Sequence, residues 1–270
     1  MSESQTEVFL YKYLPFSAGA LDTLKKGTMK FTCPSDFNDP FDCVPEIDLN
    51  SIQEIPKRKP ELIKAAAQQR GIPPEKIGEH IPEMLQRMED AVTSGVWAKD
   101  LVSGVGICSL SRDPLNILMW SHYANDHKGF CLEFRIPLYG EQHEMSNYLE
   151  WLVPHEVTYE EERPLLEIHD RSDNALDKQF LIKSTLWKYE AEERVIDHKR
   201  GPGIHSYDRS KILNSVIAGM KMEHPELGQL NNVVEKMNQE IGLNVQLYQA
   251  RPVKGRFALC VPEHPKLSET

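Results

Sequence analysis

The chain has 270 residues, of which 40% are hydrophobic and 27% are charged, and its formal net charge is −10. This balance is typical of a globular protein, and the length suffices for one large domain or for one domain that carries an insertion. The acidic excess argues against non-specific binding of duplex DNA through its phosphates, although a local basic groove can still hold a nucleic acid strand.

The N-terminal residues predict a strand, a short helix and a second strand. Residues 8–16, VFLYKYLPF, are rich in aromatic and β-branched side chains, which is typical of a strand. Ser17 fits the N-cap of a short helix that stops at Gly27. Residues 29–33 predict a second strand, and residues 34–40 are a turn-rich loop.

Residues 50–100 differ in character from the rest of the chain. Five prolines lie among two helical stretches, at residues 61–70 and 82–101. We expect a helical insertion that serves packing and partner contacts and contributes little chemistry.

The remaining sequence alternates short strands with helices, which predicts an α+β fold in which residues 1–270 form a single domain with that insertion. Residues 126–129 predict a turn, and the acidic stretch 139–178 has no clear pattern. Strands are predicted at 105–109, 130–136, 192–197, 212–218 and 245–252, and helices at 116–123, 180–188 and 229–242.

Several common motifs are absent from the sequence. It contains no phosphate-binding P-loop, no dinucleotide-binding glycine fingerprint, no H-E-x-x-H and no G-x-S-x-G. The five cysteines include no C-x-x-C pair, so we expect buried small apolar side chains in a reducing compartment. No apolar run approaches the roughly 20 residues of a membrane helix, and no secretory signal is visible, so a cytoplasmic location without membrane contact is expected.

The first group with chemical potential is Tyr11-Lys12-Tyr13. In a strand, Tyr11 and Tyr13 lie on one face and Lys12 on the other. The two aromatic rings can stack on a flat ligand, or they can be ordinary core residues.

The second group is Trp120-Ser121-His122-Tyr123, with His127 nearby. In a helix Trp120 and Tyr123 share a face, and His122 points elsewhere. His122 can act as an acid or base, bind a ligand, or brace the adjoining loop. A metal site of His122, His127 and Glu133 is disfavoured, because the i,i+5 spacing of the histidines is poor for helical ligands.

The third group is Glu190-x-Glu192 followed by Arg194. Strand or turn spacing lets both carboxylates face one way, and Arg194 can pair with one of them. One glutamate can then orient a sugar hydroxyl or stabilise a developing cation, while the arginine holds the other. A surface strand of alternating charges is the competing interpretation.

Together these blocks resemble the bacterial family DUF2971. The resemblance spans roughly residues 9–196 and extends weakly to residues 212–219. It rests on YKYLPF, FTCPSDFNDPFDC, ICSLS, ILMWSHYANDHKGFCLEF and LWKYEAEERVI, in that order.

The layout of the blocks is similar to that of ADP-ribosyltransferases, which carry key residues on an early, a middle and a late strand. This similarity implies that Tyr13 or Lys12 takes the first position, Ser109 or Tyr123 the second, and Glu192 the third. The late element of those enzymes is often E-x-E with a catalytic second glutamate. The first block here departs from that pattern because it lacks a histidine.

The similarity implies that NAD is the substrate. Glu192 would bind the ribose 2′-hydroxyl, Tyr11 and Tyr13 would clamp nicotinamide, His122 would deprotonate the acceptor or bind the diphosphate, and Arg194 would orient the glutamates. The expected catalytic residues are Glu192, Glu190 and His122, and the expected NAD-binding residues are Tyr11, Lys12, Tyr13, Asn38, Ser109, Trp120, Tyr123 and Arg194.

The resemblance further implies an ADP-ribosyltransferase-like fold with a mixed or antiparallel split sheet and peripheral helices. It implies transfer of ADP-ribose to a protein, RNA or DNA acceptor, a role as a toxin or in anti-phage defence, and an antitoxin or regulatory protein as a partner. No metal is needed for this chemistry. The alternatives are a metal-dependent or histidine-dependent hydrolase or nuclease, and a non-enzymatic ligand-binding module.

Overall fold

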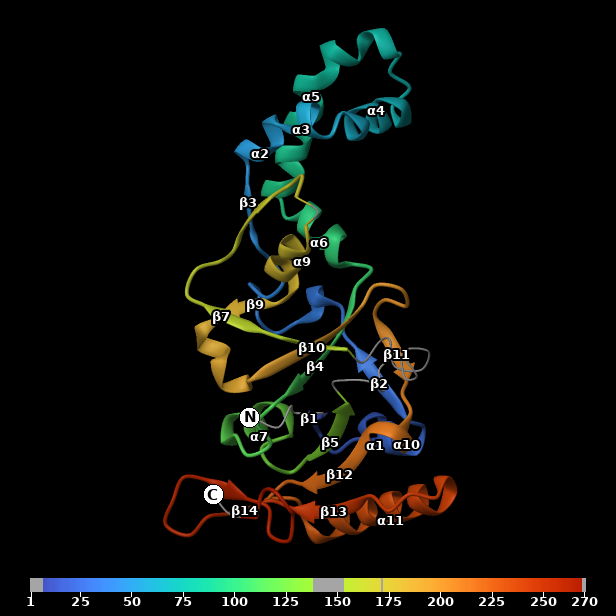
Figure 1. Ribbon diagram of the computed structural model, residues 1–270, viewed down its shortest axis with the longest axis vertical. Helices are drawn as coiled ribbons and strands as arrows, with labels where there is room; N and C mark the ends of the chain where they lie inside the picture. The colour runs from blue at the N-terminus through green and yellow to red at the C-terminus, as the bar shows by residue number, and fades with distance from the viewer. Residues whose placement is uncertain (1–6, 138–152, 171, 269–270) are drawn as a thin grey trace, which may run out of the picture. The chain divides into compact units, whose positions relative to one another are not determined.

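The computed structural model describes residues 7–137, 153–170 and 172–268 (Figure 1). The contacts within the chain group it into two compact units. The first comprises Met1–Thr32, Gly106–Val157 and Leu186–Thr270, and the second comprises Cys33–Val105 and Thr158–Thr185. The helices expected between residues 50 and 100 belong to the second unit.

A seven-stranded mixed sheet forms the centre of the first unit, in the order β13-β12-β5-β1-β4-β10-β6 (Figure 1). Neighbouring strands run antiparallel except β12 and β13, which run parallel with a helix between them in sequence. The protein is therefore a mixed α/β structure. The strands are β1 (Glu7–Leu14), β4 (Gly106–Ser111), β5 (Phe130–Pro137), β6 (Pro154–Glu156), β10 (Glu192–Asp197), β12 (Leu213–Ala218) and β13 (Gln246–Gln249).

Apolar side chains cover both faces of this sheet. On one face, Leu10 and its neighbours pack against α1 (Ala18–Lys25) and α11 (His224–Ile241). On the other face, Tyr11 and Tyr13 pack with α7 (Ile117–Tyr123) and with C-terminal residues around Leu259. The alternation of residues in β1 thus divides the core into two clusters, as the period of a strand requires.

Capping residues fix the helices that border the sheet. The Ser17 hydroxyl accepts a hydrogen bond from the Ala20 amide at 3.2 Å, and the Asn116 side chain accepts one from the Leu118 amide at 2.9 Å. Both residues satisfy amides that the first helical turn leaves unpaired. Gly242, with φ +67°, ends α11 in the left-handed conformation that favours glycine.

The second unit has its own small apolar core of isoleucine, alanine, methionine and leucine side chains. Within it, β3 pairs with β8 and β7 pairs with β9, both in parallel. Its elements are η1 (Pro34–Asp36), β3 (Glu46–Asp48), α2 (Asn50–Gln53), α3 (Ile55–Arg58), α4 (Pro60–Gln69), η2 (Pro74–Lys76), α5 (Ile77–Thr93), α6 (Val96–Val102), β7 (Thr158–Glu160), β8 (Leu165–Glu167), α9 (Asp173–Phe180) and β9 (Ile182–Ser184).

Four predicted elements differ from the structure, and one of them, the helix expected at 229–242, begins at His224 as α11. The helix expected at 180–188 is wrong, because α9 ends at Phe180 and is followed by β9 and then by the 3-10 helix η4 (Thr185–Glu190). The helix expected at 82–101 begins at Ile77 and is divided at Gly95, whose φ is +77°.

The strand expected at 245–252 is also divided. Its first part is β13, which ends at Gln249, and its second part is β14 (Arg251–Pro252), which pairs with β15 (Leu259–Cys260). Much of the unassigned stretch 139–178 lies in the second unit, and its residues 139–152 and 171 lie outside the described residues. The first unit is completed by β2 (Thr28–Phe31), β11 (Gly203–Ser206) and α10 (Arg209–Ile212).

Among the described residues, no helix combines the length and apolar character needed to cross a lipid bilayer. All five cysteines are free thiols. Cys43, Cys108 and Cys131 are buried, and burial raises the pKa of the Cys108 and Cys131 thiols. Those three therefore behave as small apolar side chains.

Candidate functional site

Three strands that carry expected site residues are neighbours in the central sheet: β1 with Tyr11-Lys12-Tyr13, β4 with Ser109, and β10 with Glu192 and Arg194. Tyr11 lies opposite Ser111, and Ser111 lies opposite Glu192. Directly opposed residues of antiparallel strands project from the same face of a sheet. Tyr11, Ser111 and Glu192 therefore form one row, although they are far apart in sequence.

Lys12 joins two of these strands from the opposite face of β1. Its ammonium group donates to the carbonyl oxygen of Ser109 at 2.7 Å, next to the position where β1 and β4 pair. Ser109 itself lies opposite Arg194. Lys12, Ser109 and Arg194 therefore lie on three neighbouring strands, and the side chain of Lys12 links β1 to β4.

Glu192 and Arg194 form a buried ion pair within β10. Arg194 has no exposed surface, and Glu192 is 5% exposed. The guanidinium Nε lies 2.9 Å from Glu192 Oε1, and Nη2 lies 3.0 Å from Oε2. This bidentate contact satisfies the geometry that a desolvated charge pair requires, and it fixes the orientation of the Glu192 carboxylate.

Glu190 lies just before the strand that carries Glu192. It is the last residue of η4, and Ala191, with φ +43°, turns the chain into β10. The sequence allowed either a strand or a turn between Glu190 and Glu192, and the structure has a turn there. The Tyr123 hydroxyl donates to Glu190 Oε1 at 2.5 Å, and the Ser111 hydroxyl donates to the Glu190 carbonyl oxygen at 2.6 Å. The second and third blocks therefore converge directly.

Four side chains near Glu190 form what we call the aromatic group: His122, Tyr123, Trp187 and Tyr189. The ring of His122 lies 6.2 Å from that of Tyr123 and 5.9 Å from that of Tyr189, and the Trp187 ring lies 6.1 Å from that of Tyr189. His122 Nδ1 lies 3.0 Å from the Tyr189 hydroxyl oxygen, and the His122 side chain is exposed. The carboxylate of Glu190 thus adjoins rings that extend to the surface.

Three of the expected NAD-binding aromatics lie in the protein core. Trp120 is fully buried, donates from Nε1 to the Pro114 carbonyl oxygen at 2.8 Å and packs edge-on against Tyr13, with 5.1 Å between the ring centroids. The Tyr13 hydroxyl donates to the Asp113 carbonyl oxygen at 2.6 Å. Tyr11 is also buried, and burial raises the pKa of both tyrosine hydroxyls. These residues support the site from inside the sheet.

Asn38 lies in the second unit. It occupies an exposed bend between η1 and Pro40, whereas the other expected site residues belong to the first unit.

Glu133 is a buried carboxylate. The sequence pattern suggested no role for it beyond the disfavoured metal site. It has no exposed surface and accepts hydrogen bonds from Tyr11 at 3.0 Å, Asn214 at 2.5 Å, Ser215 at 2.7 Å and His264 Nε2 at 3.3 Å. Burial opposes its ionisation, but the hydrogen bonds from Ser215, Asn214 and His264 outweigh it and hold the pKa of Glu133 below its ordinary value.

The imidazole of His264 is oriented by its second nitrogen. Nδ1 accepts a hydrogen bond from the Lys266 amide at 3.2 Å, which leaves the proton on Nε2 facing Glu133. Glu133 thereby ties β1, β5, β12 and the C-terminal segment together. The sequence alone did not predict this network, because a single glutamate within a strand does not reveal which distant residues donate hydrogen bonds to it.

The disfavoured metal set is not assembled. The ring of His127 stacks near Trp120, with 6.5 Å between the centroids and 14° between the planes, whereas Glu133 bonds to the donors described above. Throughout the part of the chain that the structure describes, no three His, Cys, Asp or Glu side chains form a group that can hold a metal ion.

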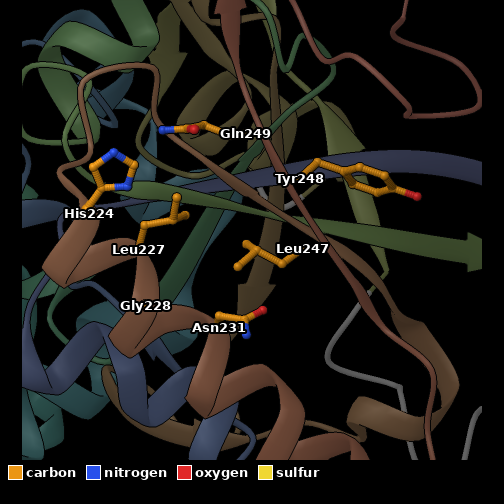
Figure 2. Close-up of a pocket in the computed structure, with 7 residues that line it drawn as sticks. All are labelled: His224, Leu227, Gly228, Asn231, Leu247, Tyr248 and Gln249. Carbon is orange, nitrogen blue, oxygen red and sulfur yellow. The ribbon is translucent and has the colours of Figure 1, made fainter.

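A hollow of about 400 Å³ lies between α11 and β13 (Figure 2). Apolar side chains from both elements form part of its wall, and Figure 2 shows the side chains of His224 and Gln249 at one end of it. None of the residues expected from the sequence lines this hollow, so it is separate from the Glu190 region. Its lining residues are His224, Leu227, Gly228, Asn231, Leu247, Tyr248 and Gln249.

Comparison with known proteins gives one result that bears on this region. Residues 119–195 match the model of a family described as a protein of unknown function, DUF2971. The matched segment begins in α7 and ends within β10, so it contains the aromatic group and both glutamates of the E-x-E sequence. No curated protein and no solved structure matches the chain. The segment that builds the candidate site is therefore similar to the DUF2971 family.

Proposed function

We propose that the chain is an ADP-ribosyltransferase-like enzyme that cleaves the nicotinamide–ribose bond of NAD and transfers ADP-ribose to a macromolecular acceptor. The observation that carries this proposal is the convergence of Glu190, Glu192, Tyr123 and Arg194 where α7, β4 and β10 meet. The adjacency of β1, β4 and β10 also agrees with a layout in which an early, a middle and a late strand supply one site.

The reaction needs a negative group beside the ribose. When the bond between C1′ and the nicotinamide nitrogen breaks, its electron pair leaves with nicotinamide, and positive charge develops on the ribose ring. A fixed carboxylate stabilises that charge and holds the 2′-hydroxyl. The acceptor nucleophile then forms a bond to C1′ and loses its proton to a base.

We assign the ribose-facing role to Glu190 and a positioning role to Glu192. Arg194 holds both carboxylate oxygens of Glu192, which suits a group that fixes geometry. Glu190 lies next to the aromatic group, whose rings offer flat surfaces for nicotinamide. The exposed imidazole of His122 is the base assigned to the acceptor.

The same proposal covers the biological setting. Consumption of NAD and modification of a macromolecule in the cytoplasm suit a toxin or a component of anti-phage defence, controlled by an antitoxin or a regulatory protein. Inducible expression of wild-type chain and of Glu190→Gln in the same cells tests this role. Growth arrest and loss of cellular NAD are expected with the wild-type chain alone.

The enzymatic test is release of nicotinamide from NAD by purified protein. We expect Glu190→Gln to lower kcat by at least about 100-fold, because a neutral amide cannot stabilise the developing cation. Glu193→Gln is the matched control. Glu193 follows Glu192 in β10 and pairs with Arg112, outside the proposed acidic centre.

Full NAD consumption by Glu190→Gln contradicts the role of Glu190. If the wild-type chain releases no nicotinamide but cleaves RNA or DNA in a manner abolished by EDTA or by His122→Ala, the chain is a nuclease and the proposal is wrong. Stable ligand binding without any turnover instead indicates a binding module.

A further inference from the structure

The C-terminal hairpin presents a compact basic surface with one exposed aromatic ring. We call residues 251–260, which run from β14 to β15, the basic loop. Its sequence, RPVKGRFALC, contains three cations and no acidic residue, whereas the whole chain carries a net charge of −10. Arg251, Lys254 and Arg256 are all exposed, and the Phe257 side chain is fully exposed. A cationic patch of this kind attracts negatively charged partners.

Backbone hydrogen bonds give the basic loop a defined shape. The Val253 amide donates to the Ala258 carbonyl oxygen at 2.9 Å, and the Arg256 amide donates to the Val253 carbonyl oxygen at 3.2 Å. Gly255, with φ +74°, occupies the third position of the resulting turn, where glycine is favoured. The base of the hairpin is anchored by buried Leu259, which belongs to the cluster around Trp120. Phe257 is therefore held outward by a fixed backbone.

An outward aromatic ring offers a flat surface on which another ring can stack. Elsewhere in the C-terminal segment, Leu259 and Val261 are buried, and Val253 and Leu267 are partly buried. Phe257 is thus a single exposed ring between Arg256 and the hairpin strand, with further cations at Lys254 and Arg251. This combination of phosphate-binding cations and a free π-face is the chemistry used to hold unpaired nucleotides.

We propose that the basic loop binds single-stranded nucleic acid, with a base stacked on Phe257 and the adjoining phosphates bound by Arg251 and Lys254. A duplex fits this surface less well, because its bases are already stacked and cannot reach the ring. A membrane surface fits less well too, because Phe257 is the one large apolar side chain fully exposed on the loop, and Val253 is partly buried. Anionic lipid and acidic protein are the competing partners that the test must separate.

This inference deepens the proposed function, on which its biological meaning rests, because it names single-stranded RNA or DNA as the class of acceptor. The binding itself requires no NAD and no catalytic glutamate. Nucleic acid binding by the Glu190→Gln protein therefore tests this proposal separately from NAD cleavage.

The experiment is fluorescence anisotropy of labelled 12-nucleotide oligo(dT) and oligo(U), titrated with the full chain at several salt concentrations. We expect Phe257→Ala to weaken binding about tenfold, which is the usual effect of losing one stacked base. Lys254→Glu is expected to weaken binding and to reduce the slope of log affinity against log salt by about 1.

Matched controls distinguish this surface from general effects. Ile204→Ala removes another exposed apolar side chain, and Lys64→Glu makes the same charge change on the second unit. Both controls are expected to bind the oligonucleotides as the wild-type chain does. Because all four substitutions are at surface positions, thermal unfolding is expected to show that the variants remain folded.

Binding of both oligonucleotides with loss in Phe257→Ala and Lys254→Glu alone supports the proposal. It is overturned if the wild-type chain does not bind them, if Phe257→Ala binds normally, or if the controls lose affinity equally. Binding to vesicles of phosphatidylserine and phosphatidylcholine without binding to the oligonucleotides assigns the loop to membranes and also overturns it.

Discussion

The hydroxyl of Tyr123 donates to Glu190 Oε1 at 2.5 Å across 67 residues of sequence. This bond links the last residue of α7 to the residue that ends η4, and Ser111 in β4 bonds to the carbonyl oxygen of the same glutamate. A glutamate that is 4% exposed is thus held from two elements. Such positioning keeps a carboxylate in one orientation, as a catalytic group requires.

Replacing Tyr123 tests this link. We expect Tyr123→Phe to lower the free energy of unfolding by about 1–3 kcal/mol, because a buried acceptor loses a donor, and to lower kcat for NAD cleavage at least about tenfold. Urea unfolding and nicotinamide release measure the two effects. Tyr248→Phe is the control, since the structure gives the Tyr248 hydroxyl no hydrogen-bond partner among the described residues, and it is expected to change stability by less than about 0.5 kcal/mol.

Arg194→Met isolates the buried ion pair. The variant leaves the Glu192 carboxylate buried beside an apolar side chain, which is expected to cost about 3–5 kcal/mol of unfolding free energy. Adding Glu192→Gln to Arg194→Met removes that charge and is expected to recover part of the loss. Urea unfolding of both single variants and of the double variant gives the coupling energy, and strictly additive effects contradict a direct pair.

The pKa of Glu133 leads to a prediction of how the free energy of unfolding depends on pH. Its folded-state pKa lies below the ordinary value of 4.5, so the folded protein binds this proton more weakly than the unfolded chain does. The ionised carboxylate therefore stabilises the fold above pH 4.5, and this contribution is lost as pH falls through the folded pKa.

In Glu133→Gln we expect a shallower decline of unfolding free energy on acidification from about pH 5, by at most about 1.4 kcal/mol per pH unit. Urea unfolding at a series of pH values measures the slope. An unchanged slope means that Glu133 has the same pKa in the folded and unfolded protein, which contradicts the prediction.

Trp120 distinguishes a core role from a ligand-binding one. We expect Trp120→Ala to reduce the unfolding free energy by about 3–5 kcal/mol, because it leaves a cavity beside Tyr13 and removes the bond to the Pro114 carbonyl oxygen. At temperatures where the variant is fully folded, the KM for NAD is expected to change less than threefold, or roughly 0.7 kcal/mol. A large rise in KM with unchanged stability indicates direct contact with the substrate instead.

Local patterns predicted several elements of the site well. Strand β10 covers residues 192–197 as expected from EERVID, and Ser17 caps α1, which borders the same sheet, as expected. The alternation of Tyr11, Lys12 and Tyr13 placed both tyrosines on one face, and they do share one cluster. Period and capping depend on neighbours within a few residues, which is why one sequence suffices to see them.

Contacts between residues that are distant in sequence could not be predicted from the sequence alone. Tyr11, Asn214, Ser215 and His264 are separated from Glu133 by 122, 81, 82 and 131 residues, so no local pattern joins them. The helix wrongly expected over residues 180–188 has the same origin, because β9 exists through its pairing with β7, more than twenty residues earlier in the chain. Tertiary pairing there overrides the local propensity.

The most direct test of the central claim is a crystal structure of the Glu190→Gln protein with NAD bound, because the variant keeps the shape of the site while slowing cleavage. The account predicts that the nicotinamide riboside lies against residue 190 and the rings of Tyr123, Tyr189 and His122, with the Glu192–Arg194 pair behind it. NAD located in the hollow between α11 and β13, or no NAD bound at saturating concentration, would contradict it.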